Sequence, residues 1–184
     1  MMDKKHILLG KTLSYILRHN PAHIQLELDS SGWADVDDLI KKMKEKGYDI
    51  TLNLLNEIVN TNDKKRYIFN ANKTKIRANQ GHSIQIDLNL KPITPPSLLY
   101  HGTSKKSIEN IQSEGLLKQK RHHVHLSEYE DVALTVGKRR GKPIILTIHS
   151  EQMHHDGHTF YRSENNVWLT DHVPASYINF SAKK

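Results

Sequence analysis

Three prolines within five residues constrain this chain more than any other feature of its sequence. They are Pro92, Pro95 and Pro96. Proline has no backbone N–H and a fixed φ, so this stretch cannot continue an α-helix or a central β-strand. We therefore predict a semi-rigid linker over residues 91–97, which divides the chain into a first part, 1–90, and a second part, 98–184.

Composition limits the class of protein. Of the 184 residues, 36% are hydrophobic and 26% are charged, which is compatible with packed cores. The sequence contains no cysteine, so disulfides, thiol nucleophiles and cysteine-based zinc sites are excluded. No apolar run reaches the roughly 18 residues of a membrane span, and the N-terminal residues lack the apolar core of a signal peptide. We therefore expect a cytoplasmic monomer that does not contact a membrane.

The charge is positive in both parts. Lys and Arg number 27 and Asp and Glu number 20, which gives a formal net charge of +7. The first 90 residues carry +3 of this charge and the remainder carries +4. Such a balance favours a polyanionic partner, either a nucleic acid or a phosphorylated small molecule.

Helical periodicity and capping residues predict three helices in the first part. Apolar residues recur at helical spacing over Ile7–Leu17, and Pro21 ends that helix. Asp35 is a good N-cap for a second helix that reaches Lys46, and Thr51 is one for a third. Extended segments are predicted at Gln25–Leu28, Arg66–Phe69, Lys75–Ala78 and Ser83–Leu88. Three helices followed by a hairpin are typical of a winged helix.

Short strands dominate the second part. They are predicted at Leu98–His101, His123–Ser127, Pro143–His149, Phe160–Arg162, Val167–Thr170 and Tyr177–Phe180. Helices are predicted from Ser104 to Gly115 and at Glu128–Val136. The expected fold class is α+β, with the second part built around a split β-sheet.

Several cations of the first part stand where they could meet phosphate. Arg18 and His19 end the first helix, where cations also stabilise the helix dipole by about 0.3–1 kcal/mol. Arg66 opens an extended segment, and a solvated turn is the alternative there. The stretch Lys75–Ser83 places several donors around Gly81, an arrangement that can cradle a phosphate.

Two motifs of the second part suggest a ligand pocket. Tyr100–Thr103 joins a strand to a helix, where a glycine allows a ligand close to the backbone and the helix start favours an anion. An ordinary tight turn is the alternative. In the segment Arg121–Ser127, strand alternation puts His123 and His125 on one side, where they could line a pocket.

Three further patterns are weaker. The histidines at 122, 123, 125, 154, 155 and 158 suggest zinc, but there is no HExxH helix and no cysteine, so we predict no metal site. Gly137–Lys142 lacks the glycine spacing of a phosphate loop, and we interpret it as a basic turn open to polyanions. Trp168 either packs in the core or contacts a ligand.

Seven motifs occur in order along the chain. They are LSYILRHNP at 13–21, GW at 32–33, KRY at 65–67, IRANQGHS at 76–83, LYHGT at 99–103, RHHVHLS at 121–127 and NVWLT at 166–170. Together they resemble the NAD-dependent RNA 2′-phosphotransferases of the bacterial branch, from about Leu9 to Phe180. Tyr67 stands where that family frequently has phenylalanine. Asn166 replaces a usual glycine, and asparagine tolerates the left-handed conformation, so the turn can survive.

The resemblance implies a winged-helix lobe for RNA and an ADP-ribosyltransferase-like lobe for NAD. It implies four catalytic residues, namely Arg18, His19, Arg66 and Arg121. It leads us to expect NAD contacts from His101, Gly102, Thr103, His125, Ser127 and Val167. RNA contacts are expected from Lys75, Arg77 and His82. No metal is needed, because arginines stabilise the phosphate charge.

The implied reaction consumes NAD. The RNA 2′-phosphate attacks the ribose carbon that bears nicotinamide, which gives a 2′-phospho-ADP-ribosylated RNA. The ribose 2″-hydroxyl then attacks phosphorus, and 2′-OH RNA and ADP-ribose 1″,2″-cyclic phosphate are released. The phosphate implied is the splice-junction phosphate of tRNA. Two alternatives stay open: an NAD-dependent ADP-ribosyltransferase that acts on nucleic-acid ends, and a non-catalytic winged-helix module that binds nucleic acid.

Overall fold

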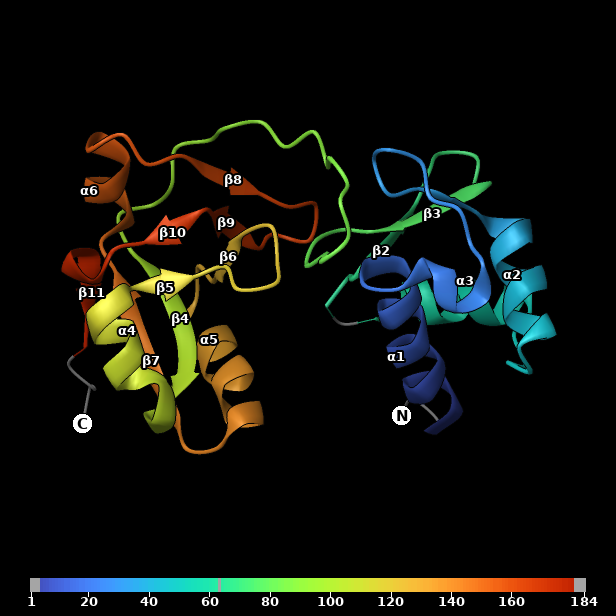
Figure 1. Ribbon diagram of the computed structural model, residues 1–184, viewed down its shortest axis with the longest axis horizontal. Coiled ribbons are helices and arrows are strands. Elements are labelled where there is room, and N and C mark those ends of the chain that lie inside the picture. The colour runs from blue at the N-terminus through green and yellow to red at the C-terminus, as the bar shows by residue number, and fades with distance from the viewer. Residues whose placement is uncertain (1–3, 63, 181–184) are drawn as a thin grey trace. The chain divides into compact units, whose positions relative to one another are not determined.

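The computed structural model describes residues 4–62 and 64–180 and contains two compact units. Unit 1 is Met1–Asn89 and unit 2 is Leu90–Lys184, so the division falls just before Pro92. The fold is mixed α/β, with small antiparallel sheets and, within the described ranges, six α-helices (Figure 1). Of these helices, none has the length and apolar character needed to cross a lipid bilayer.

Unit 1 contains three α-helices, a 3₁₀ turn and one small sheet. The helical elements are α1 (Lys4–Arg18), η1 (Pro21–Ile24), α2 (Val36–Glu45) and α3 (Leu52–Asn60). The strands are β1 (Ala34–Asp35), β2 (Tyr67–Phe69) and β3 (Lys75–Ala78). β3 is the central strand, and Ile76 pairs with Ala34 on one side and Phe69 on the other.

Capping fixes where the helices of unit 1 begin. The carboxylate of Asp35 accepts from the backbone N–H of Asp38 at 2.9 Å, and the Thr51 hydroxyl accepts from Leu54 at 3.2 Å. Both caps confirm the sequence prediction. α1 ends at Arg18, three residues before Pro21, because the residue before a proline resists the helical conformation.

Two predicted strands of unit 1 are wrong. Gln25–Leu28 is irregular because Gln25 takes a left-handed conformation, with φ of 55°, at the end of η1. Ser83–Leu88 is also irregular. The backbone N–H of Ser83 donates to the Arg18 carbonyl, and that of Asp87 donates to the Ser30 carbonyl. The second segment is therefore held by a helix end and a loop, with no partner strand.

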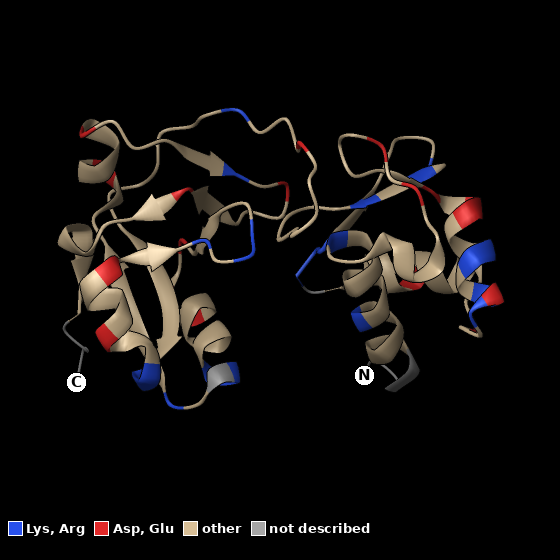
Figure 2. Cartoon of the chain, in the orientation of Figure 1, with Lys and Arg blue, Asp and Glu red and all other residues tan. Residues whose placement is uncertain are grey.

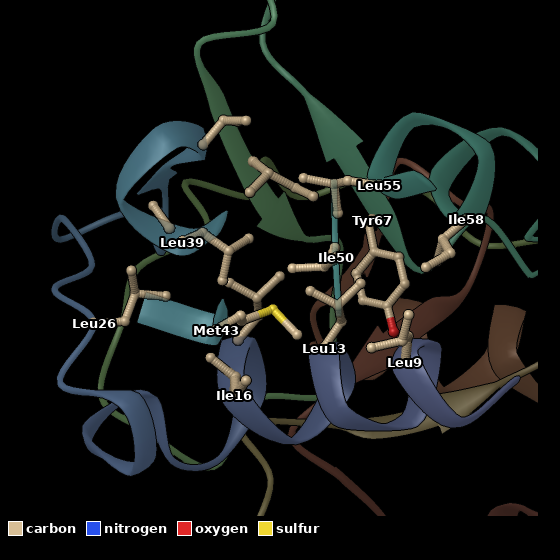
Figure 3. Packing of buried hydrophobic residues seen from close by; sticks show 14 of the residues in the cluster. Leu9, Leu13, Ile16, Leu26, Leu39, Met43, Ile50, Leu55, Ile58 and Tyr67 are labelled. Atoms are coloured by element: carbon tan, nitrogen blue, oxygen red, sulfur yellow. The ribbon is translucent and has the colours of Figure 1, made fainter. Parts of the chain in front are cut away.

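The core of unit 1 is built on the apolar face of α1. Side chains from α1, α2, α3 and the sheet pack into one cluster, including Leu13, Ile16, Leu39, Leu55 and Ile76 (Figure 3). Tyr67 joins this cluster, and its hydroxyl lies 2.6 Å from Ser14 Oγ and donates to the Gly10 carbonyl. A phenylalanine could not make these bonds, so Tyr67 ties β2 to α1.

Unit 2 contains two three-stranded sheets and one two-stranded sheet. One sheet has the order β11 (Ile178–Asn179), β7 (Pro143–Ile148), β4 (Leu99–Ser104). The second has the order β6 (Val124–Leu126), β9 (Trp168–Thr170), β8 (Phe160–Arg162). The third pairs β5 (Leu116–Leu117) with β10 (His172–Val173). The helices are α4 (Ile108–Glu114), α5 (Glu130–Gly137), α6 (Ser150–His155) and the 3₁₀ turns η2 (Lys105–Ser107), η3 (Lys138–Arg140) and η4 (Ala175–Tyr177).

Gly102 lies inside a strand, so the strand predicted to end at His101 runs further and the alternative of a tight turn is wrong. β4 continues through Gly102 to Ser104, and Gly102 pairs with Ile145 of β7. A Cβ built on Gly102 would lie 1.8 Å from the carbonyl oxygen of Ala133 in α5. Glycine is therefore needed here because α5 packs directly on β4, a contact between distant segments that local sequence does not reveal.

Candidate functional site

The end of α1 holds two of the predicted catalytic residues against one loop. The carbonyl of Arg18 accepts from the Ser83 N–H at 2.9 Å, and His19 Nδ1 lies 2.9 Å from Ser83 Oγ. A Cβ placed on Gly81 would lie 3.6 Å from Arg18 Nη1, so the guanidinium lies over the backbone of Gly81. The segment Asn79–Ser83 therefore orients both Arg18 and His19.

Arg66 precedes β2 and lies next to the same segment, which follows β3. Its carbonyl accepts from the Asn79 N–H at 2.9 Å, and the Asn79 side-chain amide donates to the Lys65 carbonyl at 2.6 Å. Asn62 Oδ1 accepts from both the backbone N–H and the Nη1 of Arg66, at 3.2 and 3.4 Å. The structure thus brings Arg18, His19 and Arg66 to Asn79–Ser83, although they are up to 48 positions apart in sequence.

Polar residues that orient these side chains were missed from the sequence. Asn62 and Asn79 are 7% and 5% exposed, and both bind the backbone next to Arg66. The Ser83 hydroxyl bonds the imidazole ring of His19 directly. Asn79 and Ser83 lie within the IRANQGHS motif, so the motif itself carried the signal, whereas Asn62 has no pattern that would single it out.

The residues predicted to hold RNA differ in exposure. Lys75 is exposed, and its Nζ lies 3.3 Å from Asp29 Oδ2. The Arg77 guanidinium stacks 4.6 Å from the centre of the Trp33 ring. His82 is 1% exposed and lies beside Gly32, so its side chain presents no surface to an RNA phosphate in this structure.

Asp29 anchors the loop before Trp33 as well as Lys75. Its carboxylate accepts from the backbone N–H groups of Ser31 and Trp33, both at 3.0 Å. Burial alone would raise the pKa of Asp29. The hydrogen bonds from Trp33, Lys75 and Ser31 outweigh burial and lower the pKa below its usual value. Asp29 is therefore held as a carboxylate beside Lys75.

A pocket of about 440 Å³ lies within unit 2. Four predicted site residues line it, namely His101, Thr103, Arg121 and His125. They come from β4, the loop before β6 and β6 itself, and side chains of α4 complete the wall. The structure therefore brings together residues that the sequence separates into two motifs.

Hydrogen bonds fix the proton positions on two pocket histidines. Arg121 Nη1 lies 2.8 Å from His125 Nδ1. A guanidinium only donates, so Nδ1 of His125 accepts, and the neutral ring carries its proton on Nε2. His101 Nδ1 lies 3.0 Å from the His125 carbonyl, which only accepts, so His101 donates from Nδ1. In the neutral rings, Nε2 is therefore unprotonated on His101 and protonated on His125.

Three other residues predicted to contact NAD do not line this pocket. Gly102 is covered by α5, as described above. Ser127 pairs through its backbone N–H and carbonyl with Tyr100, both at 2.8 Å, and so joins β4 to the end of β6. Val167 lies in a turn where Ser163 Oγ bonds both its N–H and its carbonyl. Asn166 in that turn has φ of 61°, which confirms the expected left-handed conformation.

The remaining histidines and Trp168 have structural contacts. No group of three or more potential metal ligands is found among the described residues. His154 Nδ1 lies 3.3 Å from the His158 carbonyl, and the His123 ring lies 5.4 Å from that of Tyr161. Burial lowers the pKa of His123 below the usual value. Trp168 is 3% exposed and donates to Glu128, so core packing accounts for it.

Known proteins resemble the chain over nearly its whole length. Residues 4–172 match the family described as RNA 2′-phosphotransferase, Tpt1 / KptA family. A protein of Flavobacterium johnsoniae is 54% identical over 174 residues, 95% of this chain and 96% of the relative. Proteins of Fusobacterium nucleatum (51% over 173 residues, 94% and 97%) and Acaryochloris marina (48% over 177 residues, 96% and 98%) are similar. All three are named "Probable RNA 2′-phosphotransferase".

Proposed function

The chain belongs to the RNA 2′-phosphotransferase, Tpt1 / KptA family, and from this premise we propose that it transfers a 2′-phosphate from RNA to NAD. NAD would be consumed as a co-substrate and supply the acceptor ribose. A phosphate oxygen bonds to the ribose carbon as nicotinamide leaves with the electron pair. The ribose 2″-hydroxyl then displaces the RNA 2′-oxygen from phosphorus, and the hydroxyl proton ends on that oxygen.

One observation in unit 1 carries the proposal. Arg18, His19 and Arg66 come from two distant motifs, yet all three border Asn79–Ser83. The Arg18 guanidinium lies over Gly81, whereas Arg66 meets this segment through its backbone carbonyl and its guanidinium bonds Asn62. Planar guanidinium groups suit a phosphate, because each fork can bind two oxygens. We assign Arg18 and Arg66 to the 2′-phosphate. His19 either donates to the phosphate or ribose or relays the proton of the second step.

In unit 2, we assign the pocket to NAD and Arg121 to the RNA 2′-phosphate. Arg121, His101 and His125 line the pocket, and guanidinium and imidazole groups suit phosphate and ribose hydroxyls. Thr103 lines the same pocket. Gly102, Ser127 and Val167 would support it through the backbone packing described above. The described residues present no metal cluster, and the proposal requires none.

The architecture supports finer assignments of the two units. Unit 1 has three helices and a β-hairpin closed by β1, which fits a winged helix that holds RNA through Lys75 and Arg77. Unit 2, with its two three-stranded sheets and the pocket, fits an ADP-ribosyltransferase-like lobe. We propose the splice-junction phosphate of tRNA as the substrate, as the family resemblance implies.

The test is to mix the protein with NAD and a short RNA that carries one internal 2′-phosphate. We expect 2′-OH RNA, nicotinamide and ADP-ribose 1″,2″-cyclic phosphate, identified by mass spectrometry. The matched RNA without the phosphate, and reactions without NAD, should give no product. Folded protein that releases no phosphate would overturn the proposal. A stable ADP-ribose adduct would favour an ADP-ribosyltransferase, and RNA binding without NAD consumption would favour a binding module.

A further inference from the structure

Five exposed cations gather at one end of the first sheet of unit 2. They are Lys105, Lys106, Lys138, Arg139 and Lys142, and we call them the basic end. Ser104, the last residue of β4, pairs with Pro143, the first residue of β7. The two lysines of η2 directly follow the end of β4, and Lys142 directly precedes the start of β7, so all three lie at the same end of the sheet. Figure 2 shows this clustering at the tips of η2, η3 and the loop before β7. The Arg140 side chain lies outside the described part.

Among the described residues, the basic end has no acidic ion-pair partner. Elsewhere Lys42 pairs with Asp38 at 2.8 Å, Lys118 with Asp171 at 3.6 Å and Arg162 with Glu128 at 3.2 Å. Within the described ranges, no ion pair involves any member of the basic end. The acidic residues of α5 lie in its first turn, at the opposite end of the helix from Lys138. Glu109, in the first turn of α4, is the carboxylate nearest in sequence to Lys105 and Lys106, and within the described part of the chain it forms no ion pair with either. The five cations therefore outnumber the acidic residues beside them.

The shape of the surface indicates what kind of anion would bind. None of the five side chains lines the pocket of unit 2, and they come from three separate segments, η2, η3 and the loop before β7. A small phosphorylated ligand would need donors that converge on one point. Cations spread over several segments instead suit a polymer whose phosphates repeat along its length.

We propose that the basic end binds the phosphate backbone of RNA, away from the 2′-phosphate that reacts. This inference rests on the proposed function for the identity of the polymer. It extends RNA binding to unit 2, beyond Lys75 and Arg77 of unit 1. Its contribution would be to affinity, because interactions made equally before and during reaction lower KM without raising kcat.

Equilibrium binding tests the inference without any need for turnover. The test variant carries Lys138→Ala, Arg139→Ala and Lys142→Ala. The control carries Lys41→Ala, Lys44→Ala and Lys46→Ala, which removes the same charge from exposed positions on and just after α2, where acidic residues are interspersed. Fluorescence anisotropy would measure binding of a long, structured 2′-OH RNA at low salt. Urea unfolding would establish that both variants are folded.

We expect the test variant to bind this RNA about tenfold more weakly and the control to bind within about twofold of the wild type. The slope of log K against log salt should fall by about 0.7–0.9 for each RNA phosphate that the test variant no longer neutralises. Equal affinities of the two variants would overturn the inference. Binding of the wild type to anionic vesicles, with none to RNA, would also overturn it.

Kinetics separate this inference from the proposed function. For a long 2′-phosphorylated RNA, the test variant should show a raised KM and an unchanged kcat. For a short RNA of a few nucleotides, which reaches only the reacting site, both constants should match the wild type. If wild-type protein gave no turnover but the basic end still governed RNA binding, the proposed function would fail and this inference would stand. If the wild type turned over fully but the test variant showed no change in RNA binding or KM, the proposed function would stand and this inference would fail.

Discussion

The two units present their candidate site residues on surfaces of different shape. In unit 1, Arg18, His19 and Arg66 border one loop, each held by hydrogen bonds or packing within its own unit. In unit 2, Arg121 and His125 line a pocket. A braced surface can accept one nucleotide of a long chain, whereas a pocket encloses a small molecule. On our proposal, unit 1 receives the 2′-phosphorylated nucleotide of RNA and unit 2 receives NAD, and each part of that proposal can be tested separately.

Removal of one arginine from each unit should have the largest effect. Arg18→Ala and Arg121→Ala should each slow release of 2′-OH RNA by about 10²–10³-fold, because each removes a donor to the charge that develops on phosphate. Arg121→Ala should also accumulate the ADP-ribosylated intermediate or abolish turnover. Lysine at either position should restore little, since it lacks the planar fork. Single-turnover assays with labelled RNA would measure both rates.

A further variant tests the division of labour. NAD affinity, measured by calorimetry without RNA, should fall for His125→Ala, which removes a side chain that lines the pocket, and stay unchanged for Arg18→Ala. Lys44→Ala, an exposed change on α2, is the control for both assays. Near wild-type rates for Arg121→Ala would remove this residue from the site. A loss of NAD affinity in Arg18→Ala would contradict the assignment of NAD to unit 2 alone.

A second prediction concerns stability and should affect one unit only. Gly102→Ala places a Cβ against the Ala133 carbonyl, and relief requires α5 to move off β4. We expect unit 2 to lose about 3 kcal/mol of unfolding free energy, at the upper end for overpacking. The chain has two tryptophans, Trp33 in unit 1 and Trp168 in unit 2. In the Trp33→Phe and Trp168→Phe backgrounds, urea unfolding should therefore report each unit separately.

The expected result is a shift of the Trp168 transition to lower urea with the Trp33 transition unchanged. Gly141→Ala is no suitable control, because Gly141 has φ of 118° and any side chain there is strained. Thr103→Ser, one residue along the same strand, is the control, because it keeps the hydroxyl and adds no atom between β4 and α5. Equal shifts of both transitions would mean that the units unfold together.

Sequence reasoning succeeded where a local signal decides the structure. Asp35 and Thr51 cap helices as predicted, because a cap depends on a hydrogen bond between residues only three positions apart in sequence. It failed where the partner is distant. Ser83–Leu88 alternates like a strand, but its hydrogen bonds go to Arg18 and Ser30. The two-residue strands β5 and β10 and the six-residue α6 were not predicted, since elements this short show no periodicity.

The candidate site shows the same limit. Motif order identified Arg18, His19, Arg66 and Arg121, but not which neighbours would orient them. Asn62 lies outside every motif and is found only from its bonds to Arg66. Gly102 stays a predicted NAD contact, and the close approach that the structure shows at this position is that of α5. In both cases the deciding contact is tertiary.

A third prediction uses the hydrogen bond between Arg121 and His125. His125 Nδ1 accepts from the guanidinium and so holds Arg121 in its present position. His125→Ala removes this acceptor, and we expect it to slow turnover by about tenfold. His125→Asn, whose side-chain oxygen can stand in for Nδ1, should lose less.

Rates for the wild type, His125→Asn and His125→Ala would be compared at saturating NAD and RNA. Equal losses in the two variants would show that the acceptor at this position does not matter. Binding of RNA to unit 1 should be unchanged in both, because Arg18 and Arg66 do not depend on His125. A parallel loss of RNA affinity would therefore break the contrast between the units.

A smaller effect, of opposite sign to Gly102→Ala, is expected at Gly10 in unit 1. Gly10 lies within α1, and a Cβ there would meet only Ile58 Cγ2, at an ordinary 3.9 Å. Alanine in a helix interior is favoured over glycine by about 0.5–1 kcal/mol. Gly10→Ala should therefore raise the urea midpoint of the Trp33 transition and leave that of Trp168 unchanged. A lowered Trp33 midpoint would mean that α1 and α3 have no room for the methyl group.

The smallest effect should appear in acid, where each unit carries one group of lowered pKa. In unit 2, burial lowers the pKa of His123, so the unfolded chain takes up its proton first. Both states are neutral above about pH 6.5, and unit 2 should lose stability as pH falls from there through the folded pKa. In unit 1, the lowered pKa of Asp29 gives stability that is present above about pH 4 and lost below it.

The Trp168 transition should thus weaken at a higher pH than the Trp33 transition. His123→Gln should remove the loss of stability in unit 2, and Asp29→Asn should remove the loss in unit 1. Both groups are partly exposed and solvent screens them, which is why we expect these slopes to be shallow. A shared pH profile for the two transitions would show that other groups govern the acid response of both units.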